Sequence, residues 1–314
     1  MPEIVRLARL AEERGFESVW VAETRMTRDA FVPVAAIAAA TERIEVGTGI
    51  VNVYTRGPVV LAISFLSLEE LAPGRILMGL GTGSPLVLAP QGVPFEKPLT
   101  RLREYVKVIR PLTRGEAVTY RGEAVRLEGA RIEDVLGATA GPPREIPLYL
   151  GVTGPRALEL TGELADGALL NICLPVAYVE RALGLIERGA RGARRSPADV
   201  DVAMAIVVSP HADSRAGKDR ARRLVALYLS LFPNIARETG LEESLLAATR
   251  SAFAEGGVDA AARCLGDEVV DLLCAAGTPD ECLARLDAYR AAGVALPILV
   301  PVEGSLELAI ETLA

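Results

Sequence analysis

One cluster of small and polar residues, in the run GVTGPRALEL, could bind a phosphate group. Gly151, Val152, Thr153 and Gly154 lie between an expected strand and an expected helix, and Pro155 takes the first helical position, which proline favours. The unpaired N–H groups and the dipole of a helix start favour an anion, and a threonine hydroxyl adds a donor. The same residue types also cap an ordinary turn, so both interpretations stay open at this point.

Glycines recur at the end of another strand, in the run GLGTGS. Gly79, Gly81 and Gly83 alternate, with Thr82 between the last two. Glycine in a strand permits the close approach of a ligand, so an aromatic ring could lie against this strand end. Alternating glycines also occur at barrel corners. The run is not a dinucleotide fingerprint, because no GxGxxG opens a helix here.

Acid–base chemistry has one candidate, Glu23, at the end of the run FESVWVAE. A carboxylate half-buried beside a cofactor ring would have a raised pKa and could donate or accept a proton. The alternative is a solvated loop glutamate paired to Arg25 or Arg28. Asn171, at the end of a later strand, is a candidate polar contact. The only histidine, His211, falls in a helical stretch and is interpreted as structural or solvent-exposed.

The bulk composition argues against several classes of protein. The chain of 314 residues has 41 acidic and 34 basic side chains, a net charge of −7, which argues against partners such as nucleic acid or an anionic membrane. Its four cysteines form no CxxC pair, so neither a metal site nor a disulfide framework is predicted. No apolar stretch is long enough to cross a membrane, and charges interrupt the first twenty residues. We expect a cytoplasmic protein.

Short β-rich runs alternate with amphipathic helices along the chain, which predicts parallel strands. Strands are expected at residues 16–23, 44–52, 75–83, 146–152, 167–173, 200–208 and 296–302, with helices between them. Two connections are long. We expect residues 82–145 to hold a helix near 98–112 and a hairpin at 116–129, and residues 209–277 to be almost wholly helical.

Seven strands are one fewer than a (β/α)8 TIM barrel needs. The chain begins in what would be the first helix, so the usual first strand is expected to be absent or replaced. Its neighbours would then expose edges, and we expect another segment, a partner chain or local disorder near residues 17–22 to compensate. Long insertions after strands 4 and 7 would build the wall of an active site. The whole chain, 1–314, is expected to form one domain.

Several runs, in their order and spacing, resemble the bacterial luciferase-like superfamily. They are GFESVWVAE, DAFVPVAAIAAATERIEVGTGIVNVYTRGP, GRILMGLGTGS, AVTYRGEAVRLEGARI and GVTGPRALELTGELADGALLN. The similarity covers nearly the whole chain and is greatest to coenzyme F420-dependent oxidoreductases of the methylenetetrahydromethanopterin reductase type. Branches that use FMN share much of the pattern. The resemblance implies a TIM barrel of luciferase-like type, with the cofactor across the C-terminal mouth of the barrel.

The resemblance also implies which residues bind the cofactor. Members of the superfamily carry a bulge with a non-proline cis peptide at the end of the third strand, and the matching bond is Gly49–Ile50. Asn52 and the polar residues after it would then line the cavity. The expected cofactor-binding residues are Thr24, Gly49, Ile50, Asn52, Gly81, Thr82, Gly83, Gly151, Val152, Thr153, Gly154 and Asn171.

The chain departs from its relatives at three positions that bear on catalysis. A histidine common after the second strand is replaced by Glu23 and Thr24, an acid found in some relatives after the fourth strand is replaced by Ser84, and a first-strand glutamate has no counterpart. Glu23 is therefore the one expected catalytic residue.

The resemblance implies hydride transfer between coenzyme F420 and a small organic substrate, with one similar to methylenetetrahydromethanopterin as the named example. Two alternatives stay open: an FMN-dependent luciferase-like monooxygenase, and a cofactor-binding relative without catalytic activity. A homodimer is also implied. The alanine-rich run VAAIAAATER could pack against a second copy, although burial within one copy explains its composition equally well.

Overall fold

The computed structural model describes residues 1–23, 27–133, 145–302 and 304–314, so Thr24 and Arg25 lie outside the described residues. Two compact units can be distinguished, and each is described by itself. The first comprises Met1–Gly151 and Glu163–Gly167, and the second comprises Val152–Gly162 and Ala168–Ala314. The expectation of one domain stays a prediction.

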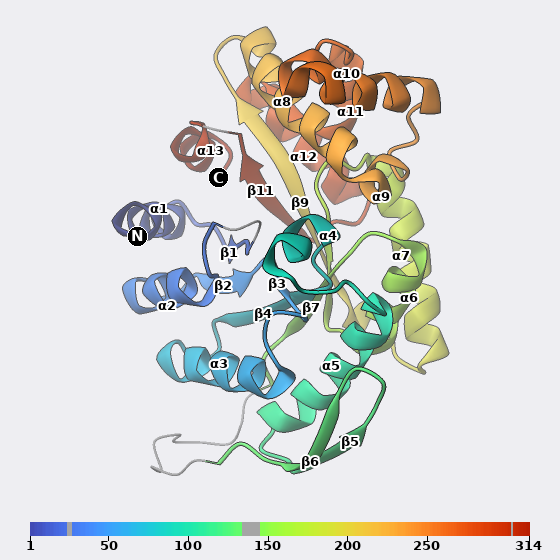
Figure 1. Ribbon diagram of the computed structural model, residues 1–314. Helices are drawn as coiled ribbons and strands as arrows, with labels where there is room; N and C mark the ends of the chain where they lie inside the picture. Colours follow the sequence, from blue (N-terminus) through green and yellow to red (C-terminus); the bar gives the residue numbers. More distant parts are fainter. Residues whose placement is uncertain (24–26, 134–144, 303) are drawn as a thin grey trace. The chain divides into compact units, whose positions relative to one another are not determined.

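The first unit is built on parallel strands that alternate with helices (Figure 1). Its first half contains α1 (Pro2–Glu13), β1 (Ser18–Val21), α2 (Phe31–Ala40), β2 (Glu45–Thr48), β3 (Val51–Asn52), α3 (Pro58–Leu71) and β4 (Ile76–Gly81). Strand β2 pairs with β1 and β4, and β3 pairs with β4. All six residues of β4 are buried, as expected for a parallel strand covered on both faces.

The connection after β4 carries the first predicted insertion. It contains α4 (Pro85–Leu88), the short 3-10 helix η1 (Ala89–Gln91), α5 (Pro98–Thr113), and the antiparallel pair β5 (Val118–Arg121) and β6 (Arg126–Ala130). Strand β7 (Leu148–Val152) then returns to pair in parallel with β4. The helix and the hairpin expected in this connection are both confirmed.

A buried carboxylate fastens this hairpin to helix α5. Glu104, only 5% exposed, accepts hydrogen bonds from the backbone N–H groups of Glu123, Ala124 and Val125 at 2.8–2.9 Å. Burial alone would raise the pKa of Glu104, but the three amide donors outweigh it and hold the pKa below its ordinary value near 4.5. The ionised form is therefore the one that stabilises the fold.

Glu104→Gln is expected to lower the free energy of unfolding by about 3 kcal/mol at neutral pH, since an amide cannot accept all three bonds. Because the folded pKa is depressed, the contribution of Glu104 is complete above pH 4.5 and is lost as the pH falls through the folded pKa. Urea unfolding between pH 7 and pH 3 should therefore show that the free energies of unfolding of the natural chain and of Glu104→Gln become equal in acid. The exposed Glu128→Gln is the control. A difference in the free energy of unfolding that stays constant down to pH 3 would contradict this role of the carboxylate.

The second unit carries the remaining strands and the helical insertion. Its elements are α6 (Pro155–Leu164), β8 (Gly167–Leu170), α7 (Val176–Gly192), η2 (Pro197–Asp199), β9 (Asp201–Pro210), α8 (Ser214–Leu231), α9 (Pro233–Ala236), α10 (Glu243–Ala262), α11 (Asp267–Leu273), β10 (Ala275–Gly277), α12 (Pro279–Ala291), β11 (Leu296–Pro301) and α13 (Leu306–Thr312). The end of α6 and the first residue of β8 are assigned to the first unit. Strands β10 and β11 both pair in parallel with the ten-residue β9. Helices α8, α10 and α11 pack together in the insertion that follows β9 (Figure 1).

Most expected strands and helices are confirmed, and the differences are local. The strand expected at 44–52 is divided into β2 and β3, and the stretch expected to be wholly helical ends in the short strand β10. Among the described residues, β1 pairs with β2 alone and β11 with β9 alone, and every residue of both strands is half-exposed. Residues 17–22 are ordered, so local disorder does not compensate for the missing strand, whereas cover by another segment or by a partner chain stays a prediction.

Candidate active site

The break between β2 and β3 is the bulge that the sequence predicted. The Gly49–Ile50 peptide bond is cis. Val46 pairs with Ile76 and Val51 pairs with Leu80, so five residues of one strand run beside four of β4. One residue is therefore extra on the β2–β3 side, which is the definition of a β-bulge.

The glycines of β4 and β7 make room for this bulge. A Cβ atom on Gly79 would overlap the backbone carbonyl oxygen of Thr48, and a Cβ on Gly81 or Gly151 would lie 2.8 Å from the Ile50 side chain. Gly83 has a positive φ of 64°, which side chains other than glycine rarely adopt. Protein atoms therefore account for these glycines. Their predicted contact with a cofactor ring is a separate expectation, and stays a prediction.

Asn52 organises the chain that leaves the bulge. It is 4% exposed, and its Oδ1 accepts hydrogen bonds from the backbone N–H groups of Tyr54 at 3.0 Å and Thr55 at 2.9 Å. This pattern is an Asx turn, which reverses the chain after a strand. The side chain that was expected to line the cavity thus holds the loop that follows it. Thr82 on the neighbouring strand end makes a long hydrogen bond of 3.4 Å to the Gly83 carbonyl.

Glu23 is held by an arginine from the same loop region as the bulge. Both of its carboxylate oxygens accept hydrogen bonds from Arg56, at 2.9 and 2.8 Å, and its side chain is 16% exposed. Arg56 also pairs with Asp29 and stacks on the Phe31 ring, with 5.1 Å from its Cζ to the ring centroid. The predicted alternative, a solvated glutamate paired to a neighbouring arginine, is not what the structure places here.

The electrostatic surroundings of Glu23 suit proton transfer. Burial raises the pKa of Glu23 above its ordinary value and the nearby Asp29 charge adds to the effect, while Arg56 opposes it. A raised pKa brings a carboxyl closer to neutral pH, where an acid or base operates well. Arg56 is among the polar residues after Asn52 that were expected to line the cavity, but its pairing with Glu23 was not predicted, because the two lie 33 positions apart.

In the second unit, the predicted phosphate cradle is a helix start with open space beside it. Gly154 precedes α6, and its carbonyl accepts the N–H groups of Ala157 and Leu158 at 3.0 and 3.1 Å. No atom lies within 4 Å of the position that a Gly154 Cβ would take. The Thr153 carbonyl accepts the Tyr178 hydroxyl at 2.6 Å, which fixes this turn. An anion beside Gly154 would lie at the start of α6, where the first N–H groups of a helix have no partner within the helix.

Two other predicted residues of this unit have local roles. Asn171 follows β8, and its Oδ1 accepts the N–H of Ile172 at 2.9 Å. His211 follows β9, and its Nδ1 accepts the N–H of Asp213 at 3.0 Å, which supports the interpretation of this histidine as structural.

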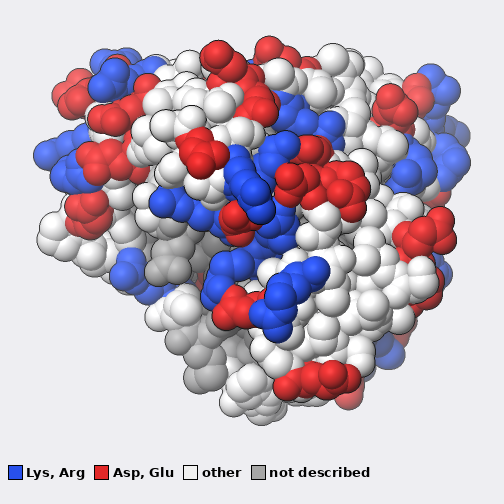
Figure 2. All heavy atoms as spheres, turned by 90° about the horizontal axis from the view of Figure 1, so that it is seen from above, with Lys and Arg blue, Asp and Glu red and all other residues white. Residues whose placement is uncertain are grey.

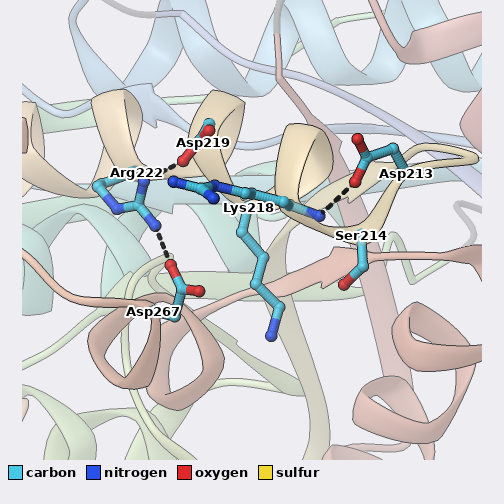
Figure 3. A pocket seen from close by; sticks show the side chains of 7 residues that line it. Asp213, Ser214, Lys218, Asp219, Arg222 and Asp267 are labelled. Carbon is cyan, nitrogen blue, oxygen red and sulfur yellow. Dashed lines mark hydrogen bonds and ion pairs between the residues drawn. The ribbon is translucent and has the colours of Figure 1, made fainter.

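A pocket of about 430 Å³ opens at the start of α8, near the start of α11 (Figure 3). Charged side chains dominate its lining, but they neutralise one another. Arg222 pairs with Asp219 and Asp267, as Figure 3 shows, and Lys218 pairs with Asp271 at 2.7 Å. The lining carries three acidic and three basic side chains, Asp213, Asp219, Asp267, Arg215, Lys218 and Arg222, so it has no excess of either charge to select a ligand.

Other classes of site find no support in the described residues. Their histidine, cysteine and acidic side chains form no cluster that could hold a metal, and the four cysteines are free thiols. On the face seen in Figure 2, basic and acidic side chains are interspersed rather than gathered in a patch of one sign. None of the helices in this part of the chain has the length and apolarity needed to span a membrane.

Comparison with known proteins identifies the family. Residues 1–296 match the family described as luciferase-like monooxygenase. The chain is 34% identical over 294 residues to the 5,10-methylenetetrahydromethanopterin reductase of Methanolobus tindarius, covering 93% of this chain and 88% of that one. It is 32% identical over 297 residues to the reductase of the same name from Archaeoglobus fulgidus, covering 93% and 87%.

A solved structure extends the similarity to the fold. The coenzyme F420 dependent tetrahydromethanopterin reductase of Methanopyrus kandleri aligns over 99% of this chain and 93% of its own, with a TM-score of 0.88 and 28% identity. The fold is thus a TIM barrel of luciferase-like type, which confirms the predicted fold class. The chain belongs to the luciferase-like monooxygenase family.

Proposed function

We propose that this protein is a coenzyme F420-dependent oxidoreductase that transfers hydride between F420 and a small organic substrate, one resembling methylenetetrahydromethanopterin. The observation that carries the proposal is the 34% identity, over 93% of the chain, to a methylenetetrahydromethanopterin reductase.

The residues present fit a phosphate-bearing cofactor. We assign the phosphate to the start of α6 at Thr153 and Gly154, where the space beside Gly154 is open. The predicted ring contacts at Ile50 and Gly81 lie in the first unit and stay a separate prediction. F420, when bound, supplies the hydride chemistry, and the protein contributes orientation and electrostatics. The other predicted cofactor residues belong to this proposal as well.

Glu23 is proposed to move the proton that accompanies hydride transfer. Its raised pKa and its fixed place beside Arg56 support this role. The guanidinium would keep the carboxyl group from rotating away, and its charge would keep the pKa from rising too far for exchange near neutral pH.

A turnover assay tests the proposal. Reduced F420 is mixed with the purified protein and methylenetetrahydromethanopterin, and the return of F420 absorbance is followed. We expect turnover by the natural chain, and a loss of about a hundredfold or more in Glu23→Gln with cofactor affinity retained. Binding of F420 without turnover of this substrate or of small carbonyl compounds would favour a cofactor-binding protein without catalysis.

We also infer that the protein forms a homodimer through α2 and α3, which pack on each other. Helix α2 is apolar throughout, and α3 is apolar except at its serines and glutamates; Val32, Val60, Ile63 and Leu71 are between 45% and 62% exposed. On α3, residues 60, 63 and 71 follow the spacing of one helix face. Large apolar side chains that are exposed together mark an interaction surface, so we expect a second copy to cover this face.

The double variant Val60→Glu with Ile63→Glu is expected to be monomeric at concentrations where the natural chain is dimeric, because two carboxylates would lose their hydration in the interface. Light scattering after gel filtration measures the mass. The melting temperature should change little, since both side chains are exposed in one copy. Leu306→Glu, at another exposed leucine, is the control. A monomeric natural chain, or a variant that stays dimeric, would reject this interface.

A further inference from the structure

Arg101 on helix α5 differs from the other arginines of its surroundings. Arg56, Arg103 and Arg110 each face a carboxylate. Arg101 has no ion-pair partner among the residues that the structure describes, although its side chain is half-buried and its Nε is shielded from solvent with no hydrogen-bond partner. A partly desolvated cation without a counter-charge is costly, so such a group is poised to accept an anion.

Two tyrosines flank this guanidinium. Its Cζ lies 4.7 Å from the centroid of the Tyr54 ring, and its charge opposes the burial that raises the pKa of the nearby Tyr105 hydroxyl. The hydroxyl protons of both tyrosines point elsewhere, to the Glu96 carbonyl at 2.7 Å and to the Arg56 carbonyl at 3.0 Å. Stacking on an aromatic face keeps an arginine planar and leaves its edge free to meet a carboxylate or phosphate.

The acid closest along the chain cannot serve as the missing partner. Glu104 stands three positions further on α5, but its two oxygens already accept three backbone N–H groups of the hairpin. Arg101 also belongs to the surroundings of the bulge. Tyr54, on which it stacks, is joined through its own N–H to Asn52, the last residue of β3.

We propose that Arg101, flanked by Tyr54 and Tyr105, binds a carboxylate or phosphate group of the substrate, which is therefore an anionic molecule. The proposal rests on the proposed function, and it adds the charge class of the substrate. The same chemistry could come from the charged tail of the cofactor, and the experiment separates these two sources.

The test uses calorimetric titrations of the natural chain, Arg101→Gln, Arg101→Lys and Arg103→Gln. Arg103 lies on the same helix and pairs with Glu163, so its variant is the matched control. Each protein, free of cofactor and loaded with F420, is titrated with inorganic phosphate and with succinate, and separately with F420. Circular dichroism and melting temperature report whether each variant is folded. If Arg101→Gln does not fold, Arg101→Lys, which retains the positive charge, is compared with the natural chain instead.

We expect Arg101→Gln to weaken binding of phosphate or succinate about tenfold or more. Arg101→Lys should be intermediate, because it retains the charge but not the paired N–H donors of the guanidinium. F420 affinity should stay within about twofold, and Arg103→Gln should match the natural chain. A tenfold loss of F420 affinity with unchanged anion binding would assign Arg101 to the cofactor tail and overturn the substrate assignment. Unchanged binding of all three probes would reject the site altogether. Because the anions are also tested without cofactor, failure to bind F420 would count against the proposed function alone.

Discussion

Gly79→Ala is expected to leave the chain largely unfolded or insoluble, with a loss of more than about 4 kcal/mol in the free energy of unfolding. The added methyl group would overlap the Thr48 carbonyl oxygen, which is backbone and cannot swing away. The Thr48 hydroxyl also donates to the Gly79 carbonyl at 2.7 Å and accepts the Gly79 N–H at 3.1 Å. Separating the two strands would break both bonds in a fully buried place.

Gly57→Ala is the matched control for this substitution. Gly57 precedes α3 with a φ of −68°, and no atom lies within 4 Å of its would-be Cβ. Its replacement should change the free energy of unfolding by less than about 1 kcal/mol. Denaturant unfolding of soluble protein, or the soluble fraction on expression, measures the difference. A soluble Gly79→Ala protein that melts within a few degrees of the natural chain would contradict the close packing of β2 on β4.

Gly154→Asp is expected to weaken cofactor binding by at least an order of magnitude, about 1.4 kcal/mol, because it places a negative charge where the phosphate is proposed to bind. Folding should not suffer, since aspartate is favourable at the start of a helix such as α6. A fluorescence titration with F420 and a thermal melt separate these two effects.

Gly154→Ala is the steric control for the aspartate. With no atom within 4 Å of the added methyl group, the alanine variant should bind nearly as tightly as the natural chain. Equal affinity in the aspartate variant would move the phosphate to another site. An equal loss of F420 affinity in both variants would mean that the loss comes from the restricted backbone at position 154 and not from the negative charge.

The parts of the fold that the sequence predicted well are those with local causes. Helix α5 and the hairpin after it follow from periodicity and turn residues. The bulge was predicted from its resemblance to a known strand end, and it lies at Gly49–Ile50 as expected. Strand β10 was missed because three small residues, Ala275–Gly277, carry no strand pattern of their own and are extended through pairing with β9.

The parts of the site that escaped prediction depend on partners distant in the chain. Alternating glycines indicate close approach, but only the structure shows that Thr48 and Ile50 occupy the space. The sequence left Glu23 open as a half-buried catalytic acid or a solvated loop acid, and its pairing with the distant Arg56 appears only in the structure. Arg101 carried no motif, and its isolation from acids is visible only when the neighbours of α5 are known.

A direct titration tests whether F420 is the cofactor of this protein. The purified, cofactor-free protein is titrated with oxidised F420 and, in parallel, with FMN, and binding is followed by cofactor fluorescence. We predict saturable binding of F420 that is about a hundredfold tighter than that of FMN, and weaker in Gly154→Asp than in Gly154→Ala. Tighter binding of FMN, or no saturable binding of F420, would contradict the central claim.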